Sequence, residues 1–293
     1  MIHISTTAFK KDIFEHIDDD LVKFIRGIEF SGGNGYYPEK KIWEKLDRLR
    51  RKGIESFLIH NYFPIPKGSF ILNFSSRNET IIRQSLSLVE QALDLCSHYN
   101  IPYYSFHPGY LSDGTEGPDG HFRFPPHSFI SYEDALSQFL QSMKQLHRMG
   151  TKKGVKLALE NLFTEPGNVR TSLNCTFYEL DEIMKSIPSD IGLLIDFGHI
   201  NIAANFLHFD KYEYVDKLLA VYANRIYEIH LSANNGKFDQ HLPLSDTDWQ
   251  LEVLPAFLTA PGIDGTGVSV TLESRRLDKR VLLDNIETIE KYM

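Results

Sequence analysis

The sequence has few of the features that direct a protein to an oxidising compartment, a membrane or a nucleic acid. Its two cysteines, Cys96 and Cys175, are too few for a disulfide framework and form no CxxC pair. No apolar run approaches the roughly 20 residues of a membrane-spanning helix, and the N-terminal Met1-Ile-His-Ile4 lacks a basic segment followed by an apolar signal region. The net charge of −8 argues against indiscriminate binding to nucleic acid. We therefore expect a cytoplasmic protein without a membrane partner.

What the sequence does contain is an alternation of short apolar runs with longer segments of helical periodicity. The runs are rich in β-branched or aromatic residues, as buried parallel strands are. They are Ile2–Ser5, Gly27–Phe30, Ser56–His60, Tyr103–His107, Val155–Glu160, Gly192–Asp196, Ile226–His230 and Val268–Glu273. The helical segments include Tyr37–Lys52, Asn78–His98, Tyr132–Gly150, Phe177–Ile187, Tyr212–Ala223 and Leu277–Tyr292. This alternation favours one α/β domain over residues 1–293, folded as a closed (β/α)8 TIM barrel rather than an open sheet.

The predicted strand-to-helix segments are much longer than the helix-to-strand segments. The longest are Asn61–Ser76, Pro108–Ile130, Asn161–Thr176 and Leu231–Trp249. In a TIM barrel these segments all lie at the C-terminal face of the strands, where active sites are built. We also expect helices to end at Gly53, Asn100 and Gly150, and one to begin at Ser131 with Asp134 three residues later.

Residues that can bind metal ions end the last six predicted strands. They are His60, His107, Glu160, Asp196, His230 and Glu273, and three more residues of the same kinds follow nearby: His199, Asp239 and His241. In a barrel these side chains converge over the axis, where unpaired polar groups are costly and neighbouring carboxylates repel one another. A metal cluster removes both problems. The alternative is a set of satisfied core polar groups or salt bridges, and it competes most strongly for His60, His107, Asp239 and His241.

The candidate ligands number five histidines and four carboxylates, whereas one tetrahedral ion takes about four ligands. A set of this size suits about two or three ions. Imidazole and carboxylate without thiolate suit Zn²⁺, with Mn²⁺ or Fe²⁺ as alternatives. The other histidines, which we assign to the surface or to helices, are His3, His16, His98, His121, His127, His147 and His208.

Several of these stretches together resemble the endonuclease IV branch of the xylose isomerase-like TIM barrels (AP endonuclease family 2), along nearly the whole chain. The similar stretches are Phe106-His107-Pro-Gly109, Leu159-Glu160-Asn161, Ile195-Asp196-Phe-Gly-His199, Asp239-Gln-His241, Leu272-Glu273 and Leu72-Asn73-Phe-Ser-Ser76. The resemblance implies a trinuclear zinc site. It implies that His60 and His107 hold one ion with Glu160, which bridges to a second ion held by Asp196, His230 and Glu273. By the same resemblance, His199, Asp239 and His241 hold the third.

Two stretches depart from the DNA repair enzymes of this family. Those enzymes carry an Asn-Pro-Arg element after the second strand, whereas Ser31-Gly-Gly-Asn-Gly35 contains no arginine. Prolines in Asn61–Phe70 stand where the family's DNA-wedging residues would lie. His241-Leu-Pro-Leu244, followed by Ser-Asp-Thr-Asp-Trp249, instead resembles sugar phosphate isomerase/epimerase-like members. We therefore expect a small sugar or sugar phosphate as substrate, with nucleic acid the less favoured partner.

Three functions are compatible with this interpretation. The favoured one is metal-assisted cleavage of a phosphoester in a sugar-phosphate-like substrate, with Glu160 beside the nucleophile and Arg275, Arg276 or Lys237 as candidate phosphate contacts. The second is sugar or sugar-phosphate isomerisation or epimerisation, in which one divalent ion polarises the substrate and Glu160 and Glu273 relay protons through an enediolate. The third, a non-enzymatic sugar-binding barrel, is disfavoured by the complete ligand set.

Overall fold

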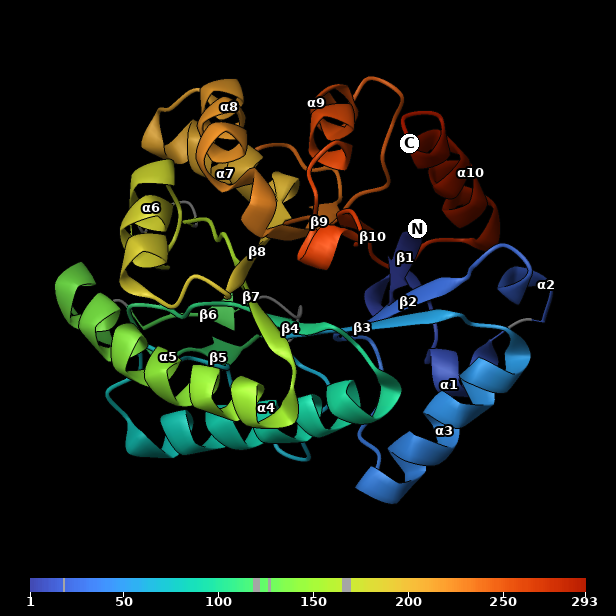
Figure 1. Ribbon diagram of the computed structural model, residues 1–293, viewed down its shortest axis with the longest axis horizontal. Coiled ribbons are helices and arrows are strands. Elements are labelled where there is room, and N and C mark those ends of the chain that lie inside the picture. Colours follow the sequence, from blue (N-terminus) through green and yellow to red (C-terminus); the bar gives the residue numbers. More distant parts are fainter. Residues whose placement is uncertain (18, 118–121, 126–127, 165–169) are drawn as a thin grey trace.

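The computed structural model describes residues 1–17, 19–117, 122–125, 128–164 and 170–293. Eight parallel strands close into a barrel, as the sequence predicts (Figure 1). They are β1 (Ile2–Ser5), β2 (Gly27–Phe30), β3 (Ser56–His60), β4 (Tyr103–Phe106), β7 (Lys156–Glu160), β8 (Gly192–Asp196), β9 (Ile226–Leu231) and β10 (Ser269–Leu272). Each strand pairs with the next barrel strand along the chain, and β10 pairs with β1. The fold is therefore a (β/α)8 TIM barrel.

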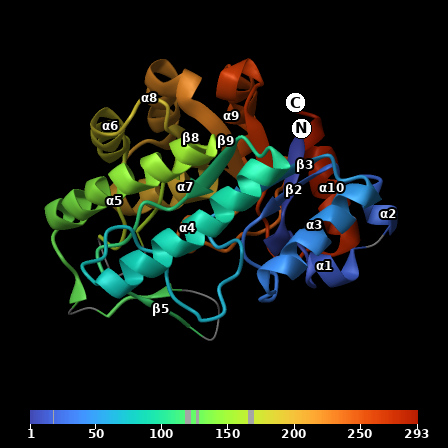
Figure 2. The same ribbon diagram turned by 60° about the horizontal axis from the view of Figure 1, so that its bottom comes forward.

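Helices surround the barrel on its outer side, as both views of the ribbon show (Figures 1 and 2). The longer ones are α3 (Glu39–Lys52), α4 (Glu79–Tyr99), α5 (Tyr132–Lys153), α6 (Phe177–Ser186), α7 (Phe197–Leu207), α8 (Lys211–Tyr222), α9 (Trp249–Leu258) and α10 (Lys279–Glu290). Short helices α1 (Ile13–His16) and α2 (Asp19–Val22) precede β2, and an antiparallel ribbon of β5 (Thr115–Glu116) and β6 (Phe122–Arg123) follows β4. Among the described residues, no helix is both long and apolar enough to cross a membrane.

The helix ends mostly follow their predicted signals. The Ser131 side chain accepts a hydrogen bond from the backbone N–H of Asp134 and begins α5. Gly53 (φ 109°) and Asn100 (φ 55°) end α3 and α4 in the left-handed conformation. The predicted end at Gly150 is wrong, because α5 continues to a left-handed Gly154. A Cβ at residue 150 would lie 2.7 Å from the Val155 carbonyl oxygen, so close packing against the chain entering β7 explains that glycine.

The barrel interior carries buried polar side chains. Glu29 on β2 bonds to His230 on β9, and Ser105 on β4 bonds to Glu228 on β9. These strands are not neighbours, so the contacts can form only across the barrel. TIM barrel interiors are usually filled by branched apolar residues. The polar interior here lies directly beneath the strand ends, where the sequence predicts a metal site.

Candidate metal centre

The C-terminal ends of six consecutive barrel strands bring the predicted strand-end residues together. The last residues of β3, β7 and β8 are His60, Glu160 and Asp196. The next-to-last residue of β9 is His230, and the residues that directly follow β4 and β10 are His107 and Glu273. All are buried except His107, which is half-buried. The parallel register fixes this convergence, for example by pairing Asp196 with His230.

Glu160 lies at the centre of the first group. Its Oε2 is 3.3 Å from Nε2 of His60 and 3.0 Å from Nε2 of His107. Its other oxygen, Oε1, is 3.1 Å from Nδ1 of His199. The donor atoms of His60, His107 and Glu160 all lie within 4.8 Å of one another, as do those of Glu160, Asp196 and His199. Glu160 therefore belongs to two neighbouring groups, as a bridging carboxylate does.

His230 lies at the centre of the second group. Its Nδ1 is 3.2 Å from Glu273 Oε2 and 3.9 Å from Asp196 Oδ2. Asp196 also begins α7, because its Oδ1 accepts a hydrogen bond from the His199 backbone N–H at 2.7 Å. A helix that starts directly at the strand end places His199 one turn beyond Asp196, on the same side of the site.

Asp239 connects the remaining two histidines. Its Oδ2 is 2.6 Å from Nε2 of His241 and 3.9 Å from Nε2 of His199. The structure thus brings these three residues to one side of the site, although His199 groups more closely with Glu160 and Asp196. All nine residues selected from the sequence lie in one connected cluster.

Five polar atoms of the nine predicted residues are shielded from solvent and make no well-oriented hydrogen bond among the described residues, although Glu160 Oε2 and His241 Nε2 each lie close to another atom of the cluster. They are Glu160 Oε2, Asp196 Oδ2, His230 Nδ1, Asp239 Oδ1 and His241 Nε2. A buried polar atom without a partner costs about 1–3 kcal/mol, and more when it is charged. Metal ions would satisfy these atoms together, so the donor set fits one or more divalent cations.

Each histidine of the cluster also has one ring nitrogen within hydrogen-bonding distance of a further partner. For four of them this nitrogen is Nδ1, and its partners are Ser105 Oγ (His60, 3.1 Å), Tyr110 Oη (His107, 2.9 Å), the Asn161 carbonyl oxygen (His199, 2.9 Å) and the Glu273 carbonyl oxygen (His241, 3.0 Å). His230 is reversed: its Nε2 contacts Glu29 Oε2 at 2.7 Å. Such partners set the tautomer and orientation of histidines that bind metals.

The electrostatics of the cluster also favour cations. Burial alone would raise the pKa of Glu160, but the imidazoles of His107 and His60 hold it well below its usual range. Burial raises the pKa of Asp196 to about 6, although His199 acts in the opposite direction. Burial lowers the pKa of His60 to about 4, which keeps its imidazole neutral and able to bind a metal at neutral pH.

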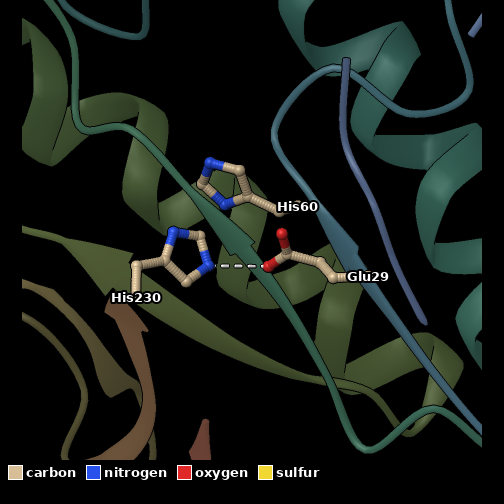
Figure 3. A group of neighbouring side chains, drawn as sticks. All are labelled: Glu29, His60 and His230. Atoms are coloured by element: carbon tan, nitrogen blue, oxygen red, sulfur yellow. Dashed lines mark hydrogen bonds and ion pairs between the residues drawn. The ribbon is translucent and has the colours of Figure 1, made fainter. Parts of the chain in front are cut away.

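Two carboxylates of the cluster were missed by the sequence interpretation. Glu29 on β2 and Glu228 on β9 are both fully buried, and Figure 3 shows Glu29 facing His60 and His230. A weak signal was present, because each is an acidic residue inside an apolar strand. Glu228 also precedes His230 by two residues, which puts both on the same face of β9.

The histidines outside the cluster mostly lie where the sequence suggests. Those on helices or at helix ends are His16, His98, His147 and His208. The assignment of His3 to the surface or a helix is wrong: it is buried on β1, with its Nε2 2.8 Å from Ser56 Oγ. His121 and His127 lie outside the described residues.

Comparison with known proteins agrees with this fold. Residues 25–292 match the family described as xylose isomerase-like TIM barrel. The chain belongs to that family. It is 27% identical over 200 residues to a protein named probable endonuclease 4 from Aquifex aeolicus, a match that covers 64% of this chain and 64% of the relative. It is 25% identical over 178 residues to the uncharacterized protein MJ1614 of Methanocaldococcus jannaschii, a match that covers 58% of this chain and 55% of the relative.

These curated relatives are matched over less than two thirds of their own length. Among solved structures, a D-tagatose 3-epimerase-like protein superimposes with a TM-score of 0.71 at 20% identity, over 99% of this chain and 96% of the other. At this identity the superposition establishes the shared fold. The chain is thus similar both to a relative named as an endonuclease and to a solved structure named as epimerase-like.

Proposed function

We propose that the strand-end cluster is a multinuclear zinc centre that cleaves a phosphoester in a sugar-phosphate-like substrate. The observation that carries this proposal is the number of buried donor atoms in the cluster, which extends beyond the close groups around Glu160 and His230 to Asp239 and His241, because one tetrahedral ion takes only about four ligands. The proposed sets are His60, His107 and Glu160; Asp196, His230 and Glu273; and His199, Asp239 and His241. Imidazole and carboxylate donors without a thiolate suit zinc.

Zinc bound at these residues would lower the pKa of water and neutralise charge on phosphoryl oxygens. Glu160 is buried between two of the sets and its pKa is held below its usual range, so its carboxylate stays ionised and orients the attacking water by accepting a hydrogen bond. Arg275 lies exposed on the rim, close enough to His241 for its positive charge to oppose the raised pKa of that imidazole. We therefore choose it as the candidate contact for a substrate phosphate.

The first experiment measures zinc content and phosphate release from a panel of sugar phosphodiesters and phosphomonoesters. We expect about two or three zinc ions per chain, together with activity that a chelator removes and zinc restores. The variants His60→Ala and His241→Ala should both lose activity, since each lies in a different proposed set. A single bound ion, with full activity in both variants, would refute the proposal.

Arg275 provides a second test, with its neighbour Arg276 as a matched control because both are exposed. If the substrate carries a phosphate that Arg275 contacts, Arg275→Ala should raise KM about 10-fold or more, as expected for the loss of a charge-assisted hydrogen bond, and Arg276→Ala should not. Equal effects of the two substitutions would exclude a specific phosphate contact at Arg275.

A specific arrangement also favours a second function, sugar or sugar-phosphate epimerisation. Glu160 on β7 and Glu273 after β10 are separated by β8 and β9, so the two carboxylates flank the group formed by Asp196 and His230. Two carboxylates on opposite sides of a bound sugar can remove and return a proton through an enediolate. Incubation with ketoses and their phosphates in D₂O separates the two functions, because only epimerisation incorporates deuterium at carbon next to the carbonyl.

Cleavage of abasic DNA is the less favoured use of the same centre, because the Asn-Pro-Arg element of the DNA repair enzymes is missing from Ser31–Gly35. We expect a nicking assay on an abasic duplex to give weak or no cleavage under conditions in which the zinc content is complete. Efficient nicking would instead identify DNA as the substrate and would require a different duplex-binding element on the rim.

A further inference from the structure

The reversed orientation of His230 has a specific structural cause. Glu29 lies on β2 and His230 on β9, yet Glu29 Oε2 and His230 Nε2 are 2.7 Å apart inside the barrel (Figure 3). Both side chains are fully shielded from solvent. The other ring nitrogen, Nδ1, faces Glu273 and Asp196 and has no hydrogen-bond partner among the described residues.

This geometry determines which nitrogen of His230 can bind a metal. A neutral imidazole carries one proton, and the nitrogen that binds a metal must present a lone pair. If the proton is on Nε2 and is donated to Glu29, the lone pair is on Nδ1 and points toward Asp196 and Glu273. Three other histidines of the cluster, His60, His107 and His241, direct Nε2 at its carboxylates instead, so His230 needs its own acceptor on the opposite edge of the ring.

Glu228 provides an internal comparison for Glu29. It is equally buried, and its Oε1 is 3.5 Å from the same His230 nitrogen, beyond ordinary hydrogen-bond length. Glu228 is held in place by the Thr271 hydroxyl, which donates to Oε1 at 2.6 Å, and by the Ser105 hydroxyl at 3.4 Å. Two buried carboxylates therefore lie beneath the site, and only Glu29 is within hydrogen-bonding distance of His230.

Glu29 could instead be a metal ligand, because donor atoms of Glu29, His60 and His230 lie within 4.8 Å of one another. The orientation of His230 argues against this alternative. The edge of its ring that faces Glu29 is opposite to the edge that faces Asp196 and Glu273.

We propose that Glu29 is a positioning residue: it accepts the Nε2–H of His230 and thereby presents Nδ1 to the metal centre. This inference rests on the proposed zinc centre but not on the reaction that the centre catalyses. Partners of this kind typically change metal affinity about 10- to 100-fold.

The test compares zinc binding by the full-length protein and three variants, in competition with a chromophoric chelator. Glu29→Ala removes the acceptor, Glu29→Gln restores an acceptor oxygen without the charge, and Glu228→Ala removes the matched carboxylate that lies farther from His230, at 3.5 Å. We expect Glu29→Ala to bind zinc about 10- to 100-fold more weakly, with Glu29→Gln recovering most of the loss and Glu228→Ala losing less. The number of ions bound at saturation should stay unchanged in all three.

Several outcomes would overturn the inference. If Glu29→Ala binds one zinc ion fewer at saturation, Glu29 is itself a ligand. Loss of buried charge, rather than loss of an acceptor, explains the effect if Glu29→Gln binds zinc as weakly as Glu29→Ala does. The same conclusion follows if Glu228→Ala binds zinc as weakly as either Glu29 variant. If wild type and Glu29→Ala bind zinc equally, the contact has no role in binding.

A second measurement needs no variant and so does not depend on whether a substituted barrel folds. In ¹⁵N-histidine NMR spectra of the zinc-loaded wild type, the proton of His230 should be on Nε2, and a proton on Nδ1 would refute the inference. The outcomes also separate the two proposals. A protein that binds zinc in this manner but releases no phosphate contradicts only the proposed function, whereas a failure confined to the Glu29 variants or the NMR spectrum contradicts only the role of Glu29.

Discussion

Zinc binding by this cluster should release protons in a number that the structure sets. Burial alone would lower the pKa of His199, His230 and His241, but neighbouring carboxylates raise all three above the usual value. In the zinc-free protein at pH 6 these imidazoles are therefore mainly protonated, and each must lose a proton to bind metal. His60 contributes none, because burial lowers its pKa to about 4.

Asp196 adds to this number. Burial raises its pKa to about 6, so at pH 6 it carries about half a proton, which it must also lose. Together these four groups should release roughly three or more protons at pH 6, so the zinc affinity should rise steeply with pH there. Calorimetric titration with zinc in two buffers of different ionisation enthalpy measures the number directly.

Two histidine variants make this prediction specific. His241→Ala should reduce the number of released protons by about one, since it removes an imidazole with a raised pKa. His60→Ala should weaken zinc binding but leave the number unchanged, since its imidazole is already neutral. The reasoning would be refuted if the wild type released almost no protons at pH 6, or if the two substitutions changed the number equally.

Three further substitutions test other contacts. His3 is buried and its pKa is lowered to about 4, so the zinc-free protein should lose roughly 3 kcal/mol of stability as the pH falls from 6.5 toward 4. In urea denaturation, His3→Gln should lose less stability than wild type over this range. An equal loss would show that His3 is not the group responsible. Gly109 has φ +136°, and an added Cβ would lie 2.6 Å from Asn73 Oδ1, so Gly109→Ala should cost about 1–3 kcal/mol, measured as a lower thermal midpoint than wild type. Tyr110→Phe removes the hydroxyl that lies 2.9 Å from His107 Nδ1 and should weaken zinc binding about 10-fold without lowering that midpoint, whereas unchanged affinity would show that the hydroxyl is dispensable.

The barrel strands were predictable because each is a short, nearly continuous apolar run, which is typical of a parallel strand buried on both faces. Two helices were harder to predict. α7 begins directly at Asp196, the last residue of β8, without an intervening turn, and α9 contains Pro255 in its interior. The apolar pattern of the sequence alone predicts neither a helix that begins at the last residue of a strand nor a helix with a proline in its interior.

The candidate site was predictable to the extent that it follows from strand ends. A residue at the end of a barrel strand has its position fixed by the fold, so six of the nine candidates could be selected from the strand ends. The other three, His199, Asp239 and His241, were selected because residues of the same kinds follow two of those strands closely. Glu29 could not, because its meaning comes from a partner 201 residues away on the opposite side of the barrel. An acidic residue inside a strand indicates that some partner exists, but not which one.

Asp196 performs two tasks with its two carboxylate oxygens. Oδ1 holds the first turn of α7 by accepting from the His199 backbone, and Oδ2 faces the cluster. Loss of the side chain would therefore loosen a helix start and shift a neighbouring imidazole at the same time as it removed a donor. Because asparagine retains the oxygen that caps the helix while alanine does not, the difference between those two replacements separates the mechanical contribution of Asp196 from its chemical one.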